Sequence, residues 1–161
     1  MHLRNQVEWA LHCCTLLAGL PPDRHLSTKA LAEFHGVPKE YLSKALQGLT
    51  RAGIVAGTLG PSGGYRLAKP PQEITFLDVV EAVEGAGKTF VCSEIRRNNP
   101  CLPKAADLPR PCAIARVMWD ADRRWRAALC ETRISDMIAT LATELDPDLL
   151  RGNAEWIEER S

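Results

Sequence analysis

The sequence is short of the features that mark membrane proteins and several large classes of enzyme. No apolar run approaches the roughly 18 residues that a membrane-spanning helix needs, and residues 1–4 lead into a charged stretch instead of the apolar core of an export signal. The sequence also contains no P-loop, no dinucleotide-binding fingerprint and no nucleophile elbow. We therefore expect a cytoplasmic protein that is not an enzyme.

A net charge is missing as well, because 20 basic residues balance 20 acidic ones in the 161-residue chain. The charges are nevertheless unevenly distributed. Residues 1–70 contain eight Lys/Arg and four acidic residues, a net charge of +4, and the remaining residues carry −4. A basic module beside an acidic remainder is compatible with nucleic-acid binding. Overall neutrality therefore does not exclude a DNA-binding protein.

Two short helices around a glycine turn are predicted in the basic part of the chain. Ser27 is a suitable N-cap for the first helix, and Gly36 can take the left-handed conformation in the turn that follows. Pro38 suits the first turn of a second helix that continues to Leu49. This arrangement is the helix-turn-helix pattern. A helical hairpin used only for packing is the alternative interpretation.

A glycine-rich hairpin follows this pattern directly. Residues 54–56 and 65–67 read as paired strands, and the glycine-rich residues 57–64 join them as a wing. Together with a first helix over residues 4–18 and a helix that begins after Thr75, they predict a mainly α fold with a small β-wing. We assign residues 1–85 to a winged helix-turn-helix DNA-binding domain.

The second half of the chain divides into three parts. Residues 86–111 break the helical pattern with prolines and mixed charge, which predicts a cysteine-bearing loop. Residues 112–145 are predicted to form dimerisation helices, because the apolar stripe of the first of them is too wide for a lone surface helix. Residues 146–161 are expected to be a loosely attached C-terminal tail.

Six cysteines in a chain without an export signal are not expected to form structural disulfides, since cytosolic thiols are kept reduced. Cys92, Cys101 and Cys112 differ from the other three, because they lie in or beside the polar, proline-rich loop, where a thiol has no core to fill. They are candidate metal ligands. Thiol switches that form disulfides under oxidation, and a zinc site, are the alternatives.

In a DNA-binding winged helix, the start of the second helix enters the major groove and the wing approaches the sugar-phosphate backbone. Side chains on this helix can reach base edges or neutralise phosphates, and the small wing residues allow close approach of the backbone. The predicted DNA-contacting residues are Thr28, Lys39, Tyr41, Ser43, Lys44, Gln47, Arg51, Ser62, Gly63, Gly64, Tyr65 and Arg66.

The wing and the segment after it carry a resemblance to a known family. Residues 60–68 read GPSGGYRLA, and EIT at residues 73–75 and VEAVEG at residues 80–85 follow. These motifs resemble the Rrf-type winged-helix regulators, the family of IscR and NsrR, over about residues 1–145. The resemblance implies a homodimeric repressor or activator that binds a near-palindromic operator. It also implies, as in many members, an iron–sulfur cluster held by cysteines of the loop before the long helix.

Two departures from the common family pattern direct attention to the first helix. The cysteine spacing is wider than usual, and Ala115 stands where IscR-type members have a histidine ligand. Residues 7–14, VEWALHCC, look most like the RsrR-like redox sensors. This resemblance implies that Glu8 and His12, which lie one helical turn apart, ligate a cluster from one subunit together with two cysteines from the other.

We expect these two cysteines to be Cys101 and Cys112, because prolines flank both, with Cys92 in reserve. A 2Fe-2S cluster is favoured over 4Fe-4S, and the expected signal is redox state, nitric oxide or iron supply. Trp9 is either a packing residue or a redox-coupling residue that moves when the charge of the cluster changes. Two other functions stay open: a cluster-free regulator controlled by thiols, a small ligand or a partner protein, and a cluster-carrying assembly protein.

Overall fold

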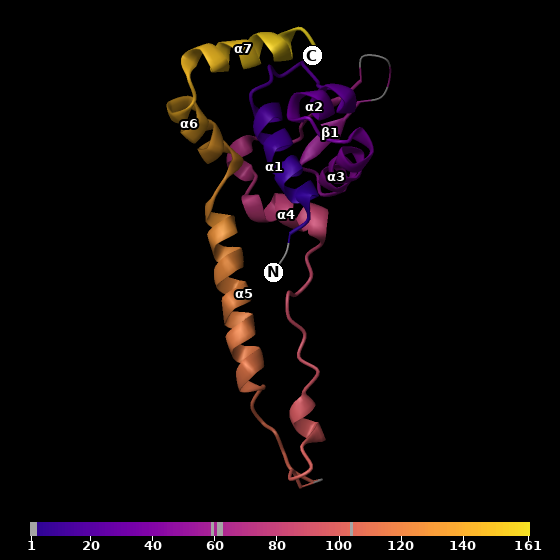
Figure 1. The fold of residues 1–161 in the computed structure, drawn as a ribbon, viewed down its shortest axis with the longest axis vertical. Coiled ribbons are helices and arrows are strands. Elements are labelled where there is room, and N and C mark those ends of the chain that lie inside the picture. Colours follow the sequence, from indigo (N-terminus) through magenta and orange to yellow (C-terminus); the bar gives the residue numbers. More distant parts are fainter. Residues whose placement is uncertain (1–2, 59, 61–62, 104) are drawn as a thin grey trace.

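The computed structural model describes residues 3–58, 60, 63–103 and 105–161. Most elements gather in a head. The irregular residues 86–103 and 105–112 and the long helix α5 (Ala113–Glu131) extend from it as an arm (Figure 1). No helix of the described residues is long and apolar enough to cross a membrane. The α-helices and strands are α1 (Asn5–Ala18), α2 (Thr28–His35), α3 (Lys39–Arg51), β1 (Val55–Gly57), β2 (Tyr65–Leu67), α4 (Phe76–Glu84), α5 (Ala113–Glu131), α6 (Ile134–Glu144) and α7 (Pro147–Glu158).

The predicted helix-turn-helix is present as α2 and α3. The Ser27 hydroxyl accepts a hydrogen bond from the Ala30 N–H at 3.1 Å and caps α2. Gly36 ends α2 with a φ of 61°, in the left-handed region that glycine tolerates. Pro38 then occupies the N-cap of α3. The buried residues of α3 are Leu42, Ala45, Leu46, Gly48 and Leu49.

The predicted wing is the antiparallel pair of β1 and β2, with Val55 opposite Leu67 and Gly57 opposite Tyr65. Tyr65 also pairs with Leu26, the residue before the cap of α2. Its N–H donates to the Leu26 carbonyl at 2.8 Å, and the Leu26 N–H donates to the Tyr65 carbonyl at 3.0 Å. The wing is therefore anchored to the start of the helix-turn-helix. These elements confirm the predicted mainly α fold with a small β-wing.

One apolar core holds the head together, and α1 lies in its middle (Figure 1). Cys13 and Cys14 of α1 are fully buried. Burial raises the pKa of the Cys13 thiol to about 12 and also raises that of Cys14, so both stay protonated and act as apolar packing groups. Ile134, at the start of α6, is also fully buried in this core. The helices after the loop therefore contribute to the core of the head.

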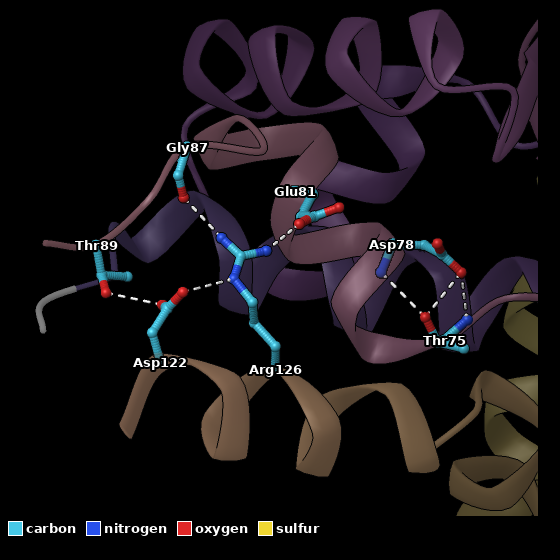
Figure 2. A network of polar contacts seen from close by, with 7 residues as sticks. All are labelled: Thr75, Asp78, Glu81, Gly87, Thr89, Asp122 and Arg126. Carbon is cyan, nitrogen blue, oxygen red and sulfur yellow. Dashed lines mark hydrogen bonds and ion pairs between the residues drawn. The ribbon is translucent and has the colours of Figure 1, made fainter. Parts of the chain in front are cut away.

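The joint between head and arm is a network of polar contacts around Arg126 of α5 (Figure 2). The guanidinium of Arg126 contacts Glu81 of α4 and donates to the Gly87 carbonyl at 2.6 Å and to the Asp122 carboxylate at 3.1 Å. Asp122 also accepts a hydrogen bond from the Thr89 hydroxyl at 2.7 Å. The start of the irregular segment is thus fixed between α4 and α5.

α4 begins with a capping box, as Figure 2 shows. The Thr75 hydroxyl accepts from the Asp78 N–H at 3.1 Å, and the Asp78 carboxylate accepts from the Thr75 N–H at 2.8 Å. Thr75 is therefore the N-cap that the sequence predicted.

The C-terminal residues do not form the loosely attached tail that we expected from Asp146 onward. Pro147–Glu158 form α7, and the Asp146 side chain caps it by accepting from the Asp148 N–H at 2.7 Å. Trp156 packs edge-on against Phe34 of α2, with ring centroids 5.0 Å apart. The helix is held in place because the apolar side chains of Trp156 and Ile157 pack against the core of the head.

Candidate nucleic-acid interface and cysteine site

A groove of about 740 Å³ runs between the helix-turn-helix and the wing. The structure brings seven of the predicted DNA-contacting residues together along it. These residues are Thr28, Lys39, Gln47, Arg51, Gly63, Gly64 and Tyr65. Lys29 and Thr58 also line this groove and were missing from our prediction. Lys29 directly follows Thr28 at the start of α2, so its position next to a predicted contact was the available signal.

Four other predicted contacts, all among the described residues, lie outside the lining of this groove. Tyr41 and Lys44 are exposed on α3, with the Lys44 ammonium 5.6 Å from the centre of the Tyr41 ring. The Ser43 hydroxyl donates to the Lys39 carbonyl one turn earlier at 2.8 Å, which turns it toward its own helix. Arg66 is exposed on β2. Ser62 lies outside the described residues.

Gly64 fixes how closely the wing approaches α2. A Cβ atom at this position would lie 2.6 Å from the carbonyl carbon and oxygen of Leu26 and 2.9 Å from the Ser27 nitrogen. All three atoms belong to the backbone, so none of them can move aside cheaply. Glycine is therefore required where β2 pairs with the residue before the α2 cap.

The irregular arm segment brings two of its cysteines together with an acidic residue. Ligand atoms of Cys92, Glu94 and Cys112 all lie within 4.8 Å of one another. Cys112 is buried and the other two residues are half-buried. Cys101 is exposed and does not belong to this group. The structure thus pairs Cys112 with the residue that the sequence analysis held in reserve, Cys92, and not with the expected Cys101.

Cys112 occupies the N-cap position of α5. The nearby backbone N–H groups of Ala115 and Ile114, helped by the positive charge of Arg96, lower the pKa of the Cys112 thiol. A helix N-terminus stabilises an anion in this way because its first N–H groups have no partner within the helix. The thiolate, which is the metal-binding and nucleophilic form, is therefore favoured at Cys112.

Glu8 and His12 share one exposed face of α1 in the head. Both line a cavity of about 390 Å³, to which α6 contributes Met137 and Leu141. The His12 ring lies 5.7 Å from the ring of His35, whose pKa is lowered by burial and by His12. Trp9 is half-buried and packs against the core. Within one chain, the irregular segment that carries Cys92 and the start of α5 that carries Cys112 extend away from the head, which contains α1 (Figure 1).

The donor set of the cysteine site fits an iron–sulfur cluster. Two thiols, one with a lowered pKa, are close enough to hold one metal group, and thiolates are the preferred ligands of iron–sulfur iron. Two cysteines alone leave ligand positions open. Carboxylate and imidazole side chains, such as those exposed at Glu8 and His12, are suitable donors for the remaining positions.

Comparisons with known proteins agree with the winged-helix fold. A family model described as "Rrf2: Iron-dependent Transcriptional regulator" matches residues 3–140. YffB of Lactococcus lactis subsp. lactis (strain IL1403), named as a candidate HTH-type transcriptional regulator, is 29% identical over 160 residues. This match covers 99% of each chain. Such relatives are named as regulators, which confirms the expectation that the chain is not an enzyme.

Two solved structures share the fold. CymR, the global cysteine regulator of B. subtilis, has a TM-score of 0.65 and 21% identity, and the match covers 87% of this chain and 98% of CymR. IscR of T. potens has a TM-score of 0.67 and 20% identity, with 91% and 93% of the two chains covered. At this level of identity, the two likenesses establish the architecture alone.

Proposed function

The chain belongs to the Rrf2 family of transcriptional regulators, and from this premise we propose that an iron–sulfur cluster, 2Fe-2S by preference, controls its affinity for DNA. Regulators of this family bind DNA and act as dimers. The observation that carries the cluster proposal is the meeting of Cys92 with Cys112 at the N-terminus of α5, where backbone N–H groups favour the thiolate.

We propose that the cluster lies between two subunits. Cys92 and Cys112 of one subunit supply two ligands, and Glu8 and His12 of the other supply the remaining two. Support comes from the exposed position of Glu8 and His12 on α1 in the head, whereas the segment with Cys92 and the start of α5 with Cys112 extend away from the head of the same chain (Figure 1). Exposed apolar side chains also begin directly after Cys112, on the first turns of α5, so a second subunit that covers them comes close to this cysteine.

The proposed roles of the protein groups follow from their chemistry. A 2Fe-2S cluster supplies one-electron redox chemistry, and ligands other than thiolate on one iron raise its reduction potential. The N–H groups at the start of α5 lower the pKa of the Cys112 thiol and so favour its thiolate form. Glu8 and His12 lie on α1, which packs against α3, the proposed recognition helix. A shift of these two side chains is therefore transmitted through α1 to the position of α3.

For DNA, we propose that α3 enters the major groove and that the wing lies along the sugar-phosphate backbone. Lys39 and Arg51 then neutralise phosphates, and Gln47 reaches base edges. Because a two-fold dimer presents two such helices, the operator is near-palindromic. Operator affinity should fall steeply with salt concentration, since each phosphate contact releases counterions.

The first experiment is anaerobic purification followed by an absorption spectrum and iron and sulfide counts. We expect a brown protein with about two irons and two sulfides per chain, since a two-fold dimer contains two such sites. Cys92→Ala and Cys112→Ala should lose the colour, and the matched variant Cys101→Ala should keep it, since Cys101 stands outside the thiol pair. Loss of colour in Cys101→Ala with retention in Cys92→Ala would contradict the ligand assignment.

A gel-shift experiment then tests the link to DNA. The cluster-loaded and cluster-free proteins are titrated against the same operator fragment at one salt concentration. Unequal affinity is expected, because cluster and DNA are proposed to favour the same conformation. Equal affinity in the two forms would remove the sensing function and leave only a DNA-binding protein.

A second candidate function is a thiol switch without a cluster. The observation in its favour is the proximity of Cys92 to a Cys112 thiol whose pKa is lowered. In this case, an oxidant such as peroxide takes two electrons and two protons from the two thiols and leaves a disulfide. A colourless, metal-free protein whose DNA affinity changes with oxidation, and returns with a dithiol reductant, would select this function.

A further inference from the structure

Arg96 connects the two chain segments that carry Cys92 and Cys112. Its guanidinium donates to both carboxylate oxygens of Glu94, with Nη2 2.7 Å from Oε2. The same Nη2 donates to the Arg110 carbonyl at 2.9 Å. Glu94 stands two residues after Cys92, and Arg110 stands two residues before Cys112. One side chain thus spans the two sides of the cysteine site.

The backbone at this point adopts a conformation that requires support. Glu94 has a φ of 54°, and it is the one non-glycine residue with a positive φ in the described part of the chain. A side chain in the left-handed region is strained, so surrounding contacts must hold it there. The two hydrogen bonds from Arg96 to the Glu94 carboxylate are contacts of this kind.

Charge gives Arg96 a second effect. Ionised Cys92, Cys112 and Glu94 would place three negative charges within 4.8 Å of one another, and such charges repel. The Arg96 guanidinium is held beside them by the ion pair with Glu94. Both side chains of this pair are about one-third exposed, at 32% and 31%, so water screens their charges only in part.

We propose that Arg96 is a positioning residue of the cysteine site. It holds Cys92 beside Cys112 before any metal group arrives, and its fixed positive charge favours the reduced form of the cluster once the cluster is bound. The second part of this proposal rests on the proposed function. The first part concerns the cluster-free protein and stands independently of it.

Arg97 provides a matched control within the same segment. It is exposed, and its side chain makes no hydrogen bond among the described residues. Arg97→Gln therefore removes one positive charge from the segment and leaves the hydrogen bonds of Arg96 intact. Arg96→Gln removes a positive charge and these hydrogen bonds together. Arg96→Lys keeps the charge but lacks the planar fork that reaches two acceptors at once.

The positioning effect is measured in the cluster-free protein with phenylarsine oxide. This trivalent arsenic reagent takes up two neighbouring thiols, forms two As–S bonds and releases its oxygen as water. The exposed Cys101 and Cys130 are first replaced by serine, and peptide mapping confirms that arsenic bridges Cys92 and Cys112. Circular dichroism of each variant confirms that the helices remain.

We expect Arg96→Gln to weaken arsenical binding about tenfold, the scale of one hydrogen-bonded link to a charged group. Arg96→Lys should fall in between, and Arg97→Gln should match the parent protein. Glu94→Gln releases Arg96 from the other side, so it should weaken binding as well, and the double variant should be little worse than either single one. Equal binding by the Arg96→Gln and Arg97→Gln variants would overturn the positioning role.

The charge effect is measured as the midpoint potential of the loaded protein in an anaerobic dye titration. Arg96→Gln should shift the potential to more negative values, because the reduced cluster loses a favourable positive charge. Arg96→Lys should stay near the parent value. An unshifted Arg96→Gln variant would overturn the charge role. A parent protein that never carries a cluster would instead refute the proposed function, and the arsenical titration would still decide the positioning role.

Discussion

At the scale of single residues, Gly64 shows how one missing side chain positions a functional element. Gly64→Ala would place a methyl group 2.6 Å from the Leu26 backbone, so the wing must move away from the start of α2. We expect a loss of about 1–3 kcal/mol in the free energy of unfolding, as for other overpacked sites, together with weaker operator binding. Urea unfolding and a gel shift at fixed salt measure the two effects.

Gly19→Ala is the control for this prediction. Its new Cβ would meet the Leu16 carbonyl oxygen at 3.5 Å, an ordinary contact, and its backbone is right-handed helical. This variant should keep both stability and DNA affinity. A Gly64→Ala variant that behaves like Gly19→Ala would mean that the wing does not need its close contact with Leu26.

The cysteines show how far single residues could be interpreted from the sequence. An apolar helical pattern separates Cys13 and Cys14, which are buried in the core, from the thiols of the polar segment. The same reasoning could not separate Cys92 from Cys101. Which of them meets Cys112 depends on where the segment reverses and on the bridge from Arg96 to the Arg110 carbonyl. Neither feature leaves a pattern in composition or spacing.

At the scale of elements, α7 was recognisable from the sequence but was assigned to a tail. Asp146 followed by Pro147 is an N-cap with proline at the first helical position, which is a helix-start signal. What the sequence could not supply is the surface on which the helix packs. Trp156 meets Phe34 of α2, and the Arg160 guanidinium lies 4.3 Å from the centre of the Trp156 ring. The contact between Trp156 and Phe34 joins residues far apart in the chain.

The joint between α4 and α5 predicts a pH-dependent stability. The Thr89 hydroxyl, followed by Arg126, lowers the pKa of the Asp122 carboxylate. Its pKa in the unfolded chain is about 3.9, so the ionised form stabilises the fold fully above about pH 4. This contribution is lost as the pH falls through the lower, folded-state pKa. The wild-type chain should therefore be more stable than Asp122→Asn at neutral pH, and the difference should shrink in acid.

Thermal unfolding of both proteins from pH 7 down to pH 3 measures this difference. Asp107→Asn, which changes an exposed carboxylate of the arm segment, is the control and should follow the wild type at every pH. A constant difference in unfolding temperature between Asp122→Asn and the wild type over this pH range would assign the effect to packing, and not to the charge of Asp122.

At the scale of the whole molecule, the arm carries large apolar side chains that the described residues of a single chain leave exposed. Ile114 and Val117 of α5 are 66% and 68% exposed, and Met118 is 41% exposed. The width of the apolar stripe was visible in the sequence and predicted a contact between subunits. The direction of the arm was not visible in the sequence, because it depends on the Arg126 network and on the burial of Ile134 in the head.

If a second copy of the chain covers this face, a charge placed on it should separate the subunits. Val117→Glu would bury an unpaired carboxylate in the interface, so we expect the dimer dissociation constant to rise at least about tenfold. Analytical ultracentrifugation over a range of concentrations measures this change. Because α5 contributes a single buried residue, Ala115, to its own chain, the head should unfold at the wild-type urea concentration.

Arg116→Glu tests whether the effect belongs to this face of the helix. Arg116 is exposed on the same turn, and the helical period places it on the side opposite Ile114 and Met118. This variant should remain a dimer. Since the proposed cluster takes ligands from two subunits, Val117→Glu should also lose iron and sulfide while Arg116→Glu keeps them. A monomeric Val117→Glu protein that still holds a full cluster would place all the ligands within one chain.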